Sequence, residues 1–340
     1  RSVSRGLGDV YKRQNLMNQI KNLSLFGICF AFVVIALGAW TRLVDAGLGC
    51  PDWPGCYGFV VFPINEADIA IAESRYPLFP YDINKAIPEV VHRYFAAGLG
   101  LIAIFLVYLS FRKTNDRSIQ GWSSFLLFFI CCQGIFGYLT VSLKLLPIIV
   151  TLHLFGGFTT LTLFYFIYLK SRNFEIFNQI NISNLKIIAG VAFLALIFQI
   201  FLGVWTSTNY ASLACADFPT CQGTYLPEMD FKNGFNLNQE VGPNYLYGLL
   251  DNPARVAIHY SHRVSAILVT FIFLILMSRL WFSEAAPLAS TLGILLLTQI
   301  ALGITNVVYV LPLYVAIAHN LFAACLLLAT FTVNYLAWKK

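Results

Sequence analysis

The segment EVVHRYFAAGLGLIAIFLVYLSF, residues 89–111, places an acid, a histidine and an arginine ahead of eighteen residues without charge. An α-helix needs about 20 predominantly apolar residues to cross a bilayer, so this segment is long enough to be a membrane span. Further segments of the chain have the same length and apolar character. We therefore predict an all-α membrane protein with eight transmembrane helices, at residues 23–44, 89–111, 121–142, 148–169, 187–208, 254–277, 288–309 and 313–337.

The composition of the whole chain agrees with a lipid environment. Of its 340 residues, 58% are hydrophobic and 11% are charged, whereas soluble domains carry about 25% charged residues. The net charge of +6 is modest, and no basic patch interleaved with aromatic residues predicts binding of nucleic acid. We interpret the basic residues between the spans as signals of membrane topology.

These basic residues predict the orientation of the chain. They concentrate around 112–117 and 170–186 and at the C-terminus, while the long connections 45–88 and 209–253 fall on the other side. Cytoplasmic loops are enriched in lysine and arginine, so we expect cytoplasmic termini and external long loops. Residues 1–22 do not resemble a signal peptide, and we expect them to be a disordered leader or an artefact.

The two halves of the sequence repeat each other. Gly38-Ala39-Trp40-Thr41 recurs as Gly203-Val204-Trp205-Thr206, and His92-Arg93 recurs as His262-Arg263. Halves with an even number of spans insert with the same topology, so we predict two pseudo-symmetric four-helix bundles about an axis along the membrane normal. The expected parts are an N-terminal bundle, a cytoplasmic linker and a C-terminal bundle, at residues 23–170, 171–186 and 187–338.

Histidines occupy matched places in this repeat, near the outer starts of their spans: His92, His153, His262 and His319. Each half thus offers two imidazoles from different helices at similar depth. Two such nitrogens are the axial ligands with which a four-helix bundle holds the iron of a haem. Intramembrane histidines can instead hydrogen-bond to backbone carbonyls, and zinc is a weaker alternative because no Cys/His cluster with zinc spacing lies in a span.

Other polar residues accompany the histidines. Glu89 lies about one helical turn before His92 on the same face, and it is either a functional acid beside the iron or a helix-starting acid after Pro88. At the equivalent place in the second half stands His259, which we expect to face the outer aqueous end, with ligation of the iron as the alternative. Arginines at the outer ends are expected to pair with haem propionates or to snorkel to the interface; these are Arg93, Arg263 and, serving the first half only, Arg42.

Cysteines form two matched pairs in the long outer loops, Cys50 with Cys56 and Cys215 with Cys221. Because the outer face of a membrane is oxidising, we expect each pair to form a disulfide. The bridges are either structural or redox-active. The other cysteines lie in spans, and we interpret them as small apolar residues.

Taken together, these motifs resemble those of the haem A synthase family, in its bacterial, cysteine-containing branch. The resemblance covers about residues 20–338 and rests on Gly38 to Leu43 with Ala46-Gly47-Leu48, on Glu89 to Arg93, on His153, on His262-Arg263 and on His319. It implies a haem-dependent oxidoreductase of the bacterial inner membrane. Such an enzyme oxidises a methyl group of haem O to a formyl group by successive hydroxylations, for cytochrome oxidase biogenesis.

The resemblance also implies roles for single residues. His92 and His153 would bind the iron of the substrate haem O, with Glu89 as the catalytic acid. His262 and His319 would bind a permanent haem b. The implied partners are haem O synthase and an electron donor, and the bridge between Cys50 and Cys56 would be redox-sensitive.

Other functions fit parts of the pattern. A di-haem b-type electron-transfer protein would have the same ligands but would hold both haems permanently, without chemistry on the porphyrin. A transporter is disfavoured because the spans lack broken helices and paired acids at mid-depth. A prenyltransferase acting on haem is disfavoured because no aspartate-rich pair lies in a cytoplasmic loop.

Overall fold

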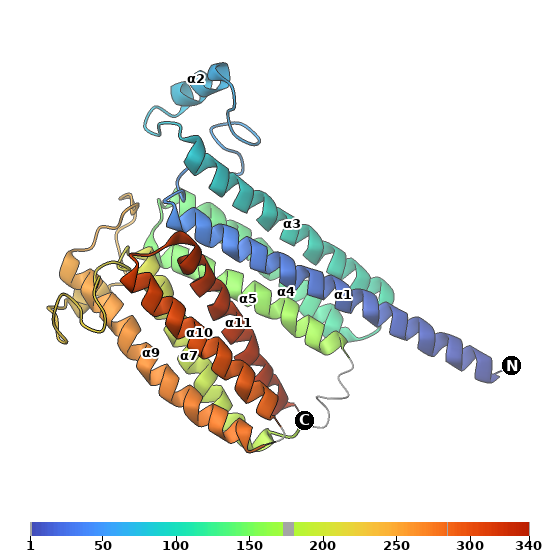
Figure 1. Cartoon of the computed structure of the whole chain (residues 1–340). Coiled ribbons are helices and arrows are strands. Elements are labelled where there is room, and N and C mark those ends of the chain that lie inside the picture. Colours follow the sequence, from blue (N-terminus) through green and yellow to red (C-terminus); the bar gives the residue numbers. More distant parts are fainter. Residues whose placement is uncertain (1, 173–179, 284, 340) are drawn as a thin grey trace. The chain divides into compact units, whose positions relative to one another are not determined.

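The computed structural model describes residues 2–172, 180–283 and 285–339, with side chains from Met17 onward (Figure 1). Within these ranges, eight helices are long and apolar enough to cross a membrane, which confirms the predicted spans. Two short helices and a 3₁₀ turn lie between them, α2 (Glu66–Arg75), α8 (Phe231–Gly234) and η1 (Ser183–Leu185). The long helices are α1 (Ser2–Leu43), α3 (Ile83–Lys113), α4 (Arg117–Ser142), α5 (Pro147–Ser171), α7 (Lys186–Thr208), α9 (Asn252–Trp281), α10 (Ala286–Val308) and α11 (Leu313–Trp338).

The chain divides into two compact units. The first comprises Arg1–Gly38, Gly49–Tyr138 and Phe155–Phe174, and the second comprises Ala39–Leu48, Leu139–Leu154 and Glu175–Lys340.

The predicted domain limits differ from these units, because the second unit includes the outer ends of α1, α4 and α5. The division into two symmetric halves therefore stays a prediction. The linker 171–186 is partly outside the described residues, and so is the start of the leader 1–22; α1 begins at Ser2.

Aromatic contacts and small residues join the helices of the first unit. Phe30 on α1 stacks on Phe95 of α3, with ring centroids 5.4 Å apart. Trp122 on α4 meets Phe166 of α5 edge to face at 4.9 Å, and Phe164 of α5 packs against α1 at Gly27. Close approach at small residues is typical of helix packing in membranes, where lipid provides no hydrophobic drive for association.

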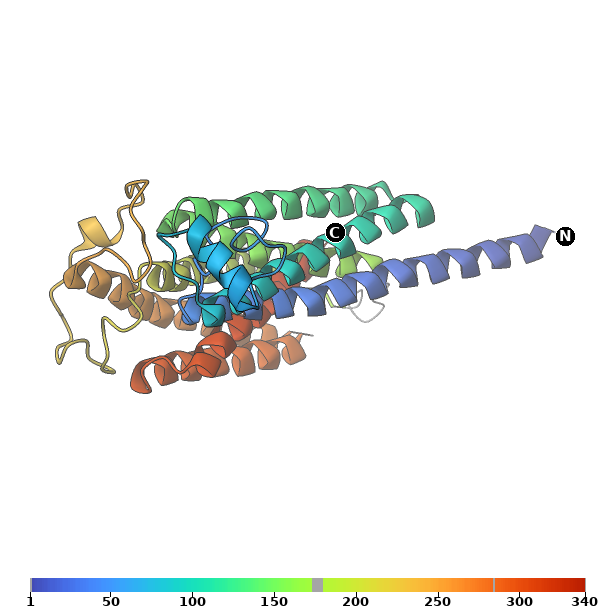
Figure 2. The same ribbon diagram turned by 90° about the horizontal axis from the view of Figure 1, so that it is seen from above.

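In the second unit, α7, α9, α10 and α11 each pack against two of the others, in the cyclic order α7, α9, α10, α11. The interior of this four-helix bundle includes fully buried apolar side chains such as Ala192, Phe273, Leu276 and Val333. Figures 1 and 2 both show the loop before α9 gathered at the beginning of that helix. A four-helix bundle with loops at one end is therefore established for this unit.

The repeat predicted from the sequence is visible in the local backbone. Left-handed φ values are uncommon for residues other than glycine, yet several recur at the offset of the repeat. Asp45 has φ 53° and Tyr210 has φ 54°, while Tyr57 has φ 57° and Gln222 has φ 55°. The same holds for Lys144 and Leu145 against Val310 and Leu311.

Each outer loop forms a small core around its disulfide. In the first loop Cys50 and Cys56 are fully buried with Tyr57 and Ala72, the latter from α2, a helix that the sequence analysis did not anticipate. In the second loop Cys215 and Cys221 pack with residues that include Val256 of α9. The loops are thus folded structures attached to the starts of α3 and α9.

Candidate functional site

In the second unit, His262 of α9 and His319 of α11 lie on two helices of one four-helix bundle. Each also contacts a glutamine on a third and a fourth helix. The amide nitrogen of Gln199 on α7 lies 3.1 Å from Nδ1 of His262, and that of Gln299 on α10 lies 3.2 Å from Nε2 of His319. All four helices of the bundle therefore contribute a polar side chain to one place.

Glycines lie directly against the histidine rings. A Cβ added to Gly203 would lie 3.0 Å from Cε1 of His262, and one added to Gly303 would lie 3.2 Å from Cε1 of His319. At these two points the histidine rings therefore pack directly against the helix backbone, with no side chain between them. Two imidazoles from different helices of one bundle are a donor set that fits the iron of a haem.

The histidines of the first half fall in different units. His92 on α3 belongs to the first unit, where a Cβ on Gly38 would lie 2.9 Å from its Cε1, as Gly203 does with His262. His153 on α5 belongs to the second unit, so the pairing of these two residues stays a prediction. Among the described residues, no three His, Cys, Asp or Glu side chains gather as a metal site of that kind would require.

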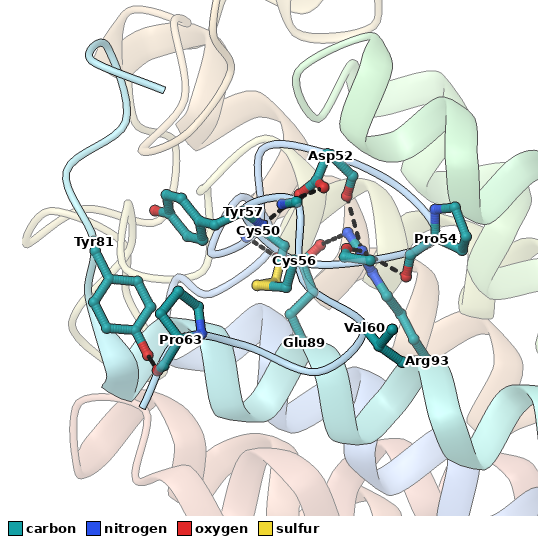
Figure 3. The surroundings of a disulfide bond; sticks show 12 residues. Cys50, Asp52, Pro54, Cys56, Tyr57, Val60, Pro63, Tyr81, Glu89 and Arg93 are labelled. Atoms are coloured by element: carbon teal, nitrogen blue, oxygen red, sulfur yellow. Dashed lines mark hydrogen bonds and ion pairs between the residues drawn. A yellow bond between two sulfur atoms is a disulfide. The ribbon is translucent and has the colours of Figure 1, made fainter. Parts of the chain in front are cut away.

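Glu89 is buried beneath the first disulfide loop (Figure 3), with 5% of its surface exposed. Its Oε2 accepts a hydrogen bond from the backbone N–H of Cys50 at 2.9 Å, and its Oε1 pairs with Arg93 at 2.5 Å. The alternative that Glu89 starts its helix is wrong, because α3 begins at Ile83 after the N-cap Asp82. The carboxylate instead links α3 to the disulfide loop.

Arg93 and Arg263 both hold the loop above them. The guanidinium of Arg93 donates to the carbonyls of Asp52 at 2.9 Å and Gly55 at 2.5 Å (Figure 3). Arg263 donates to the carbonyls of Asp217 and Thr220, the matched positions of the second loop, at 2.9 and 2.8 Å. Both arginines therefore bind loop carbonyls and do not extend freely to the membrane interface. Their pairing with haem propionates stays a prediction.

His259 does not face the outer aqueous end as expected. Only 5% of its surface is exposed, and its Nε2 accepts a hydrogen bond from Nε of Arg263 at 3.3 Å. The imidazole thus takes the place beside Arg263 that Glu89 takes beside Arg93. Spacing along a helix located the residue correctly but could not reveal that the second loop covers it.

Arg42 lies in the second unit and contacts the turn that matches its own. It donates to the carbonyl of Ser207, its counterpart in the repeat, and its guanidinium lies 3.8 Å from the ring centroid of Tyr210. It also pairs with Asp45 at 3.5 Å. The carbonyl of Ser207 belongs to the last turn of α7, where a cation is favourable. Service to the substrate haem stays a prediction for this residue.

Both predicted disulfides are present, Cys50–Cys56 and Cys215–Cys221. An aspartate inside each loop caps the turn that follows. The carboxylate of Asp52 accepts the N–H groups of Tyr57 and Gly58, and that of Asp217 accepts those of Gln222 and Gly223. Hydrogen bonds, chiefly from the hydroxyl of Thr220, lower the pKa of Asp217 to about 2.

The fold and the site define a multi-pass membrane protein with histidines paired inside a helical bundle and two disulfide-closed outer loops. Known proteins are similar to this chain along almost its whole length. The chain belongs to the COX15-CtaA family, described as cytochrome oxidase assembly protein, whose family model matches residues 21–331.

Individual relatives also match this chain over most of its length. The protein named Heme A synthase from Shewanella oneidensis (strain MR-1) is 42% identical over 315 residues, which are 92% of this chain and 95% of the relative. Proteins of the same name from Rickettsia felis and Halalkalibacterium halodurans are 28% and 26% identical, over 89% and 90% of this chain and 94% of each relative.

Proposed function

We propose that this protein is a haem A synthase, which converts the farnesylated haem O into haem A. The observation that carries the proposal is the near full-length similarity to relatives of that name, at 42% identity for one of them. The two histidines carried by the four-helix bundle of the second unit support it, because they are residues that can bind a haem. The class of enzyme is a haem-dependent oxidoreductase of cytochrome oxidase biogenesis.

We assign His262 and His319 to a permanent haem b, with Arg263 at its outer edge. The two imidazoles come from α9 and α11, and each ring packs against a glycine of a neighbouring helix, Gly203 or Gly303. A bound haem supplies one-electron transfer, which oxidation of an unactivated methyl group requires. Gln199 and Gln299 orient the rings through the hydrogen bonds described above.

We assign His92 and His153 to the substrate haem O, with Arg93 and Arg42 at its outer edge. Glu89 is the acid of this site. It lies one turn from His92 and already has two hydrogen-bond donors, so its carboxylate is held in a fixed position. A positioned carboxyl group can hold or move a proton while the substrate is oxidised.

We place the disulfide loops outside the cytoplasm and both termini inside it, in a bacterial inner membrane. Disulfides persist in oxidising compartments, and the lysine and arginine residues gather at the opposite side of the spans. The expected partners are haem O synthase, as the source of the substrate, and a separate electron donor.

The test is expression of the protein together with a source of haem O, followed by chromatography of the extracted haems. The synthase predicts haem A together with haem B. Glu89→Ala should abolish haem A while haem B remains, and the matched change Glu73→Ala, at an exposed acid of the same loop, should leave haem A unchanged. Extracts that contain only haem B, with Glu89→Ala indistinguishable from the unchanged protein, would favour a di-haem electron-transfer protein.

A further inference from the structure

The second unit carries an apolar groove of about 470 Å³ at the outer ends of α7 and α9, beside the short helix α8. No function described above uses it. Its walls consist almost entirely of aromatic and aliphatic side chains, with two serines among them. The lining residues that matter here are Phe198, Phe201, Phe231, Phe235, Ser265 and Leu268.

The two halves of the repeat differ beside this groove. Ser265 takes the place that Phe95 has in the first half, three residues after the matched histidine. Ala195 likewise takes the place of Phe30. In the first unit, Phe30 and Phe95 stack on each other at 5.4 Å, and Phe30 also covers Gly98. Two small residues thus stand in the second half where two stacked rings fill the first.

The walls of the groove suit a flat ring. Phe198 and Phe201 form a nearly parallel pair with an interplanar angle of 21°, and Phe231 and Phe235 form another with an angle of 11°. Aromatic faces of this kind favour offset stacking with a planar conjugated group. A saturated acyl chain could pack against these rings but has no conjugated face to stack on them.

Ser265 adds a polar requirement. Only 8% of its surface is exposed, and its hydroxyl has no hydrogen-bond partner among the residues that the structure describes. The other serine of the groove, Ser261, already donates to the carbonyl of Ala257 at 2.7 Å. A buried hydroxyl without a partner is unfavourable, so a hydrogen bond from Ser265 to a ligand oxygen would be stabilising.

The groove is open to the bilayer. Phe198, Val264 and Leu268 line it and are exposed on the apolar surfaces of α7 and α9. At its outer end lies Tyr260, whose hydroxyl donates to the carbonyl of Tyr225 in the outer loop at 2.8 Å. Tyrosines of this kind mark the boundary between lipid and water. A ligand here would therefore keep its ring near the outer surface and its tail in lipid.

We propose that this groove binds the ring of a membrane quinone. The ring lies between the two phenylalanine pairs, one ring oxygen accepts a hydrogen bond from Ser265, and the isoprenoid tail extends along α9 into the bilayer. Ser261 and Leu202 line the groove and directly precede His262 and Gly203 in the chain, so the groove and the histidine site share the same segments of α7 and α9. The proposal goes beyond haem A synthesis and does not depend on it.

The experiment uses the full chain, purified with its pigment, in nanodiscs of a synthetic phosphatidylcholine. The probe is a short-tailed benzoquinone that carries a photoreactive azide, and labelled peptides are mapped by mass spectrometry. We expect labels on α7, α8 or α9 that an unlabelled decyl quinone displaces. A decyl chain without the ring should not displace them.

Substitutions then test the geometry. Ser265→Phe, which restores the residue of the first half, should weaken quinone binding by more than tenfold. Ser265→Ala, which removes only the hydroxyl, should weaken it about 2- to 10-fold, as expected for one neutral hydrogen bond. Ile267→Phe is the matched control, because Ile267 is exposed on the same helix and does not line the groove; its affinity should be unchanged.

Three results would overturn the proposal: labels that lie outside the groove, affinity that is equal in the unchanged protein and both Ser265 variants, or equal displacement by the chain without a ring. The last result would mark the groove as a contact for lipid tails. If Ser265→Phe does not fold, Ser265→Ala alone decides between these outcomes. Because the readout is binding, a protein that makes no haem A can still pass or fail this test.

Discussion

The outer ends of α3 and α9 are built alike, but the residue that pairs with the arginine differs. In both, an arginine holds a disulfide loop through carbonyls at matched positions, Asp52 and Gly55 in one and Asp217 and Thr220 in the other. Beside the arginine of α3 lies the carboxylate Glu89, and beside that of α9 lies the imidazole His259. The scaffold is therefore repeated, while the chemical group under the loop is not.

A second difference concerns how the histidines are held. His262 contacts the amide of Gln199, whereas the sequence position that matches Gln199 in the first half is Val34, which has no hydrogen-bonding side chain. Hydrogen bonds to a ligand from outside its first shell fix its orientation and raise metal affinity. The second half therefore has a hydrogen-bonding side chain at this position, and the first half has an aliphatic one.

The largest expected effect is a loss of bound haem when a histidine is replaced, and it should differ between the two halves. His262→Ala and His319→Ala should each reduce bound haem B to background, because each change removes one of the two imidazoles that we assign to the iron. His92→Ala should keep haem B and lose haem A production. Haem extracted per mole of protein, measured by chromatography, checks both. Equal loss of haem B in all three variants would mean that the halves are not specialised.

The next largest effect is expected when the buried residue under the first loop is exchanged for that of the second. Glu89→His gives the first half the residue of the second, and it should lower haem A formation by about 10²–10⁴-fold, the range expected for a positioned proton donor or acceptor. Haem B content should not change. The matched change His259→Gln keeps a hydrogen-bond acceptor for Arg263 and should leave activity within a few-fold. A larger loss for His259→Gln than for Glu89→His would reverse the assignment of the two halves.

The disulfides sharpen the comparison further. Replacing both cysteines of either pair by serine should lower the free energy of unfolding by about 2 kcal/mol, because each bridge closes a short loop. Activity should fall more when Cys50 and Cys56 are replaced, because the N–H of Cys50 is a donor to Glu89. Thermal unfolding without reductant gives the stability and haem analysis gives the activity. Equal activity of the two double variants would show that the bridge between Cys50 and Cys56 does not support the function of Glu89.

The sequence predicted the parts of this comparison that repeat along the chain. Eight apolar segments of sufficient length define the spans, and matched cysteines in outer loops predicted both disulfides. Periodicity and spacing are sufficient for these features, because lipid leaves few alternatives to a helix. The placement of the histidine pair in the second bundle follows from the same repeat.

Features that depend on how a loop folds back could not be predicted. The burial of His259 and the contacts of Arg93 with loop carbonyls arise because the disulfide loops cover the starts of α3 and α9. Helix α2 lies in a loop without a strong apolar pattern, and it is recognisable only by its N-cap, Asn65, which accepts from the N–H of Asp68. Gln199 was missed because it has no partner in the repeat, although a polar residue in the middle of a span is itself a signal.

The smallest expected effect tests the glycine faces on which the rings rest. In Gly203→Ala the new Cβ would lie 3.0 Å from Cε1 of His262, so the ring must shift, at a cost of about 1 kcal/mol. Retention of haem B during dialysis should fall accordingly, by about fivefold. Gly38→Ala meets His92 at 2.9 Å and should instead weaken the binding of haem O.

The control for this prediction is Gly190→Ala on the same helix, where an added Cβ has nothing within 4 Å. This change should stabilise α7 by up to about 1 kcal/mol through helix propensity alone. Opposite signs for the two glycines of one helix would assign the loss at Gly203 to the histidine ring. If Gly203→Ala retains haem B as well as Gly190→Ala does, the ring has room to move. The bare helix face would then have no part in holding the haem.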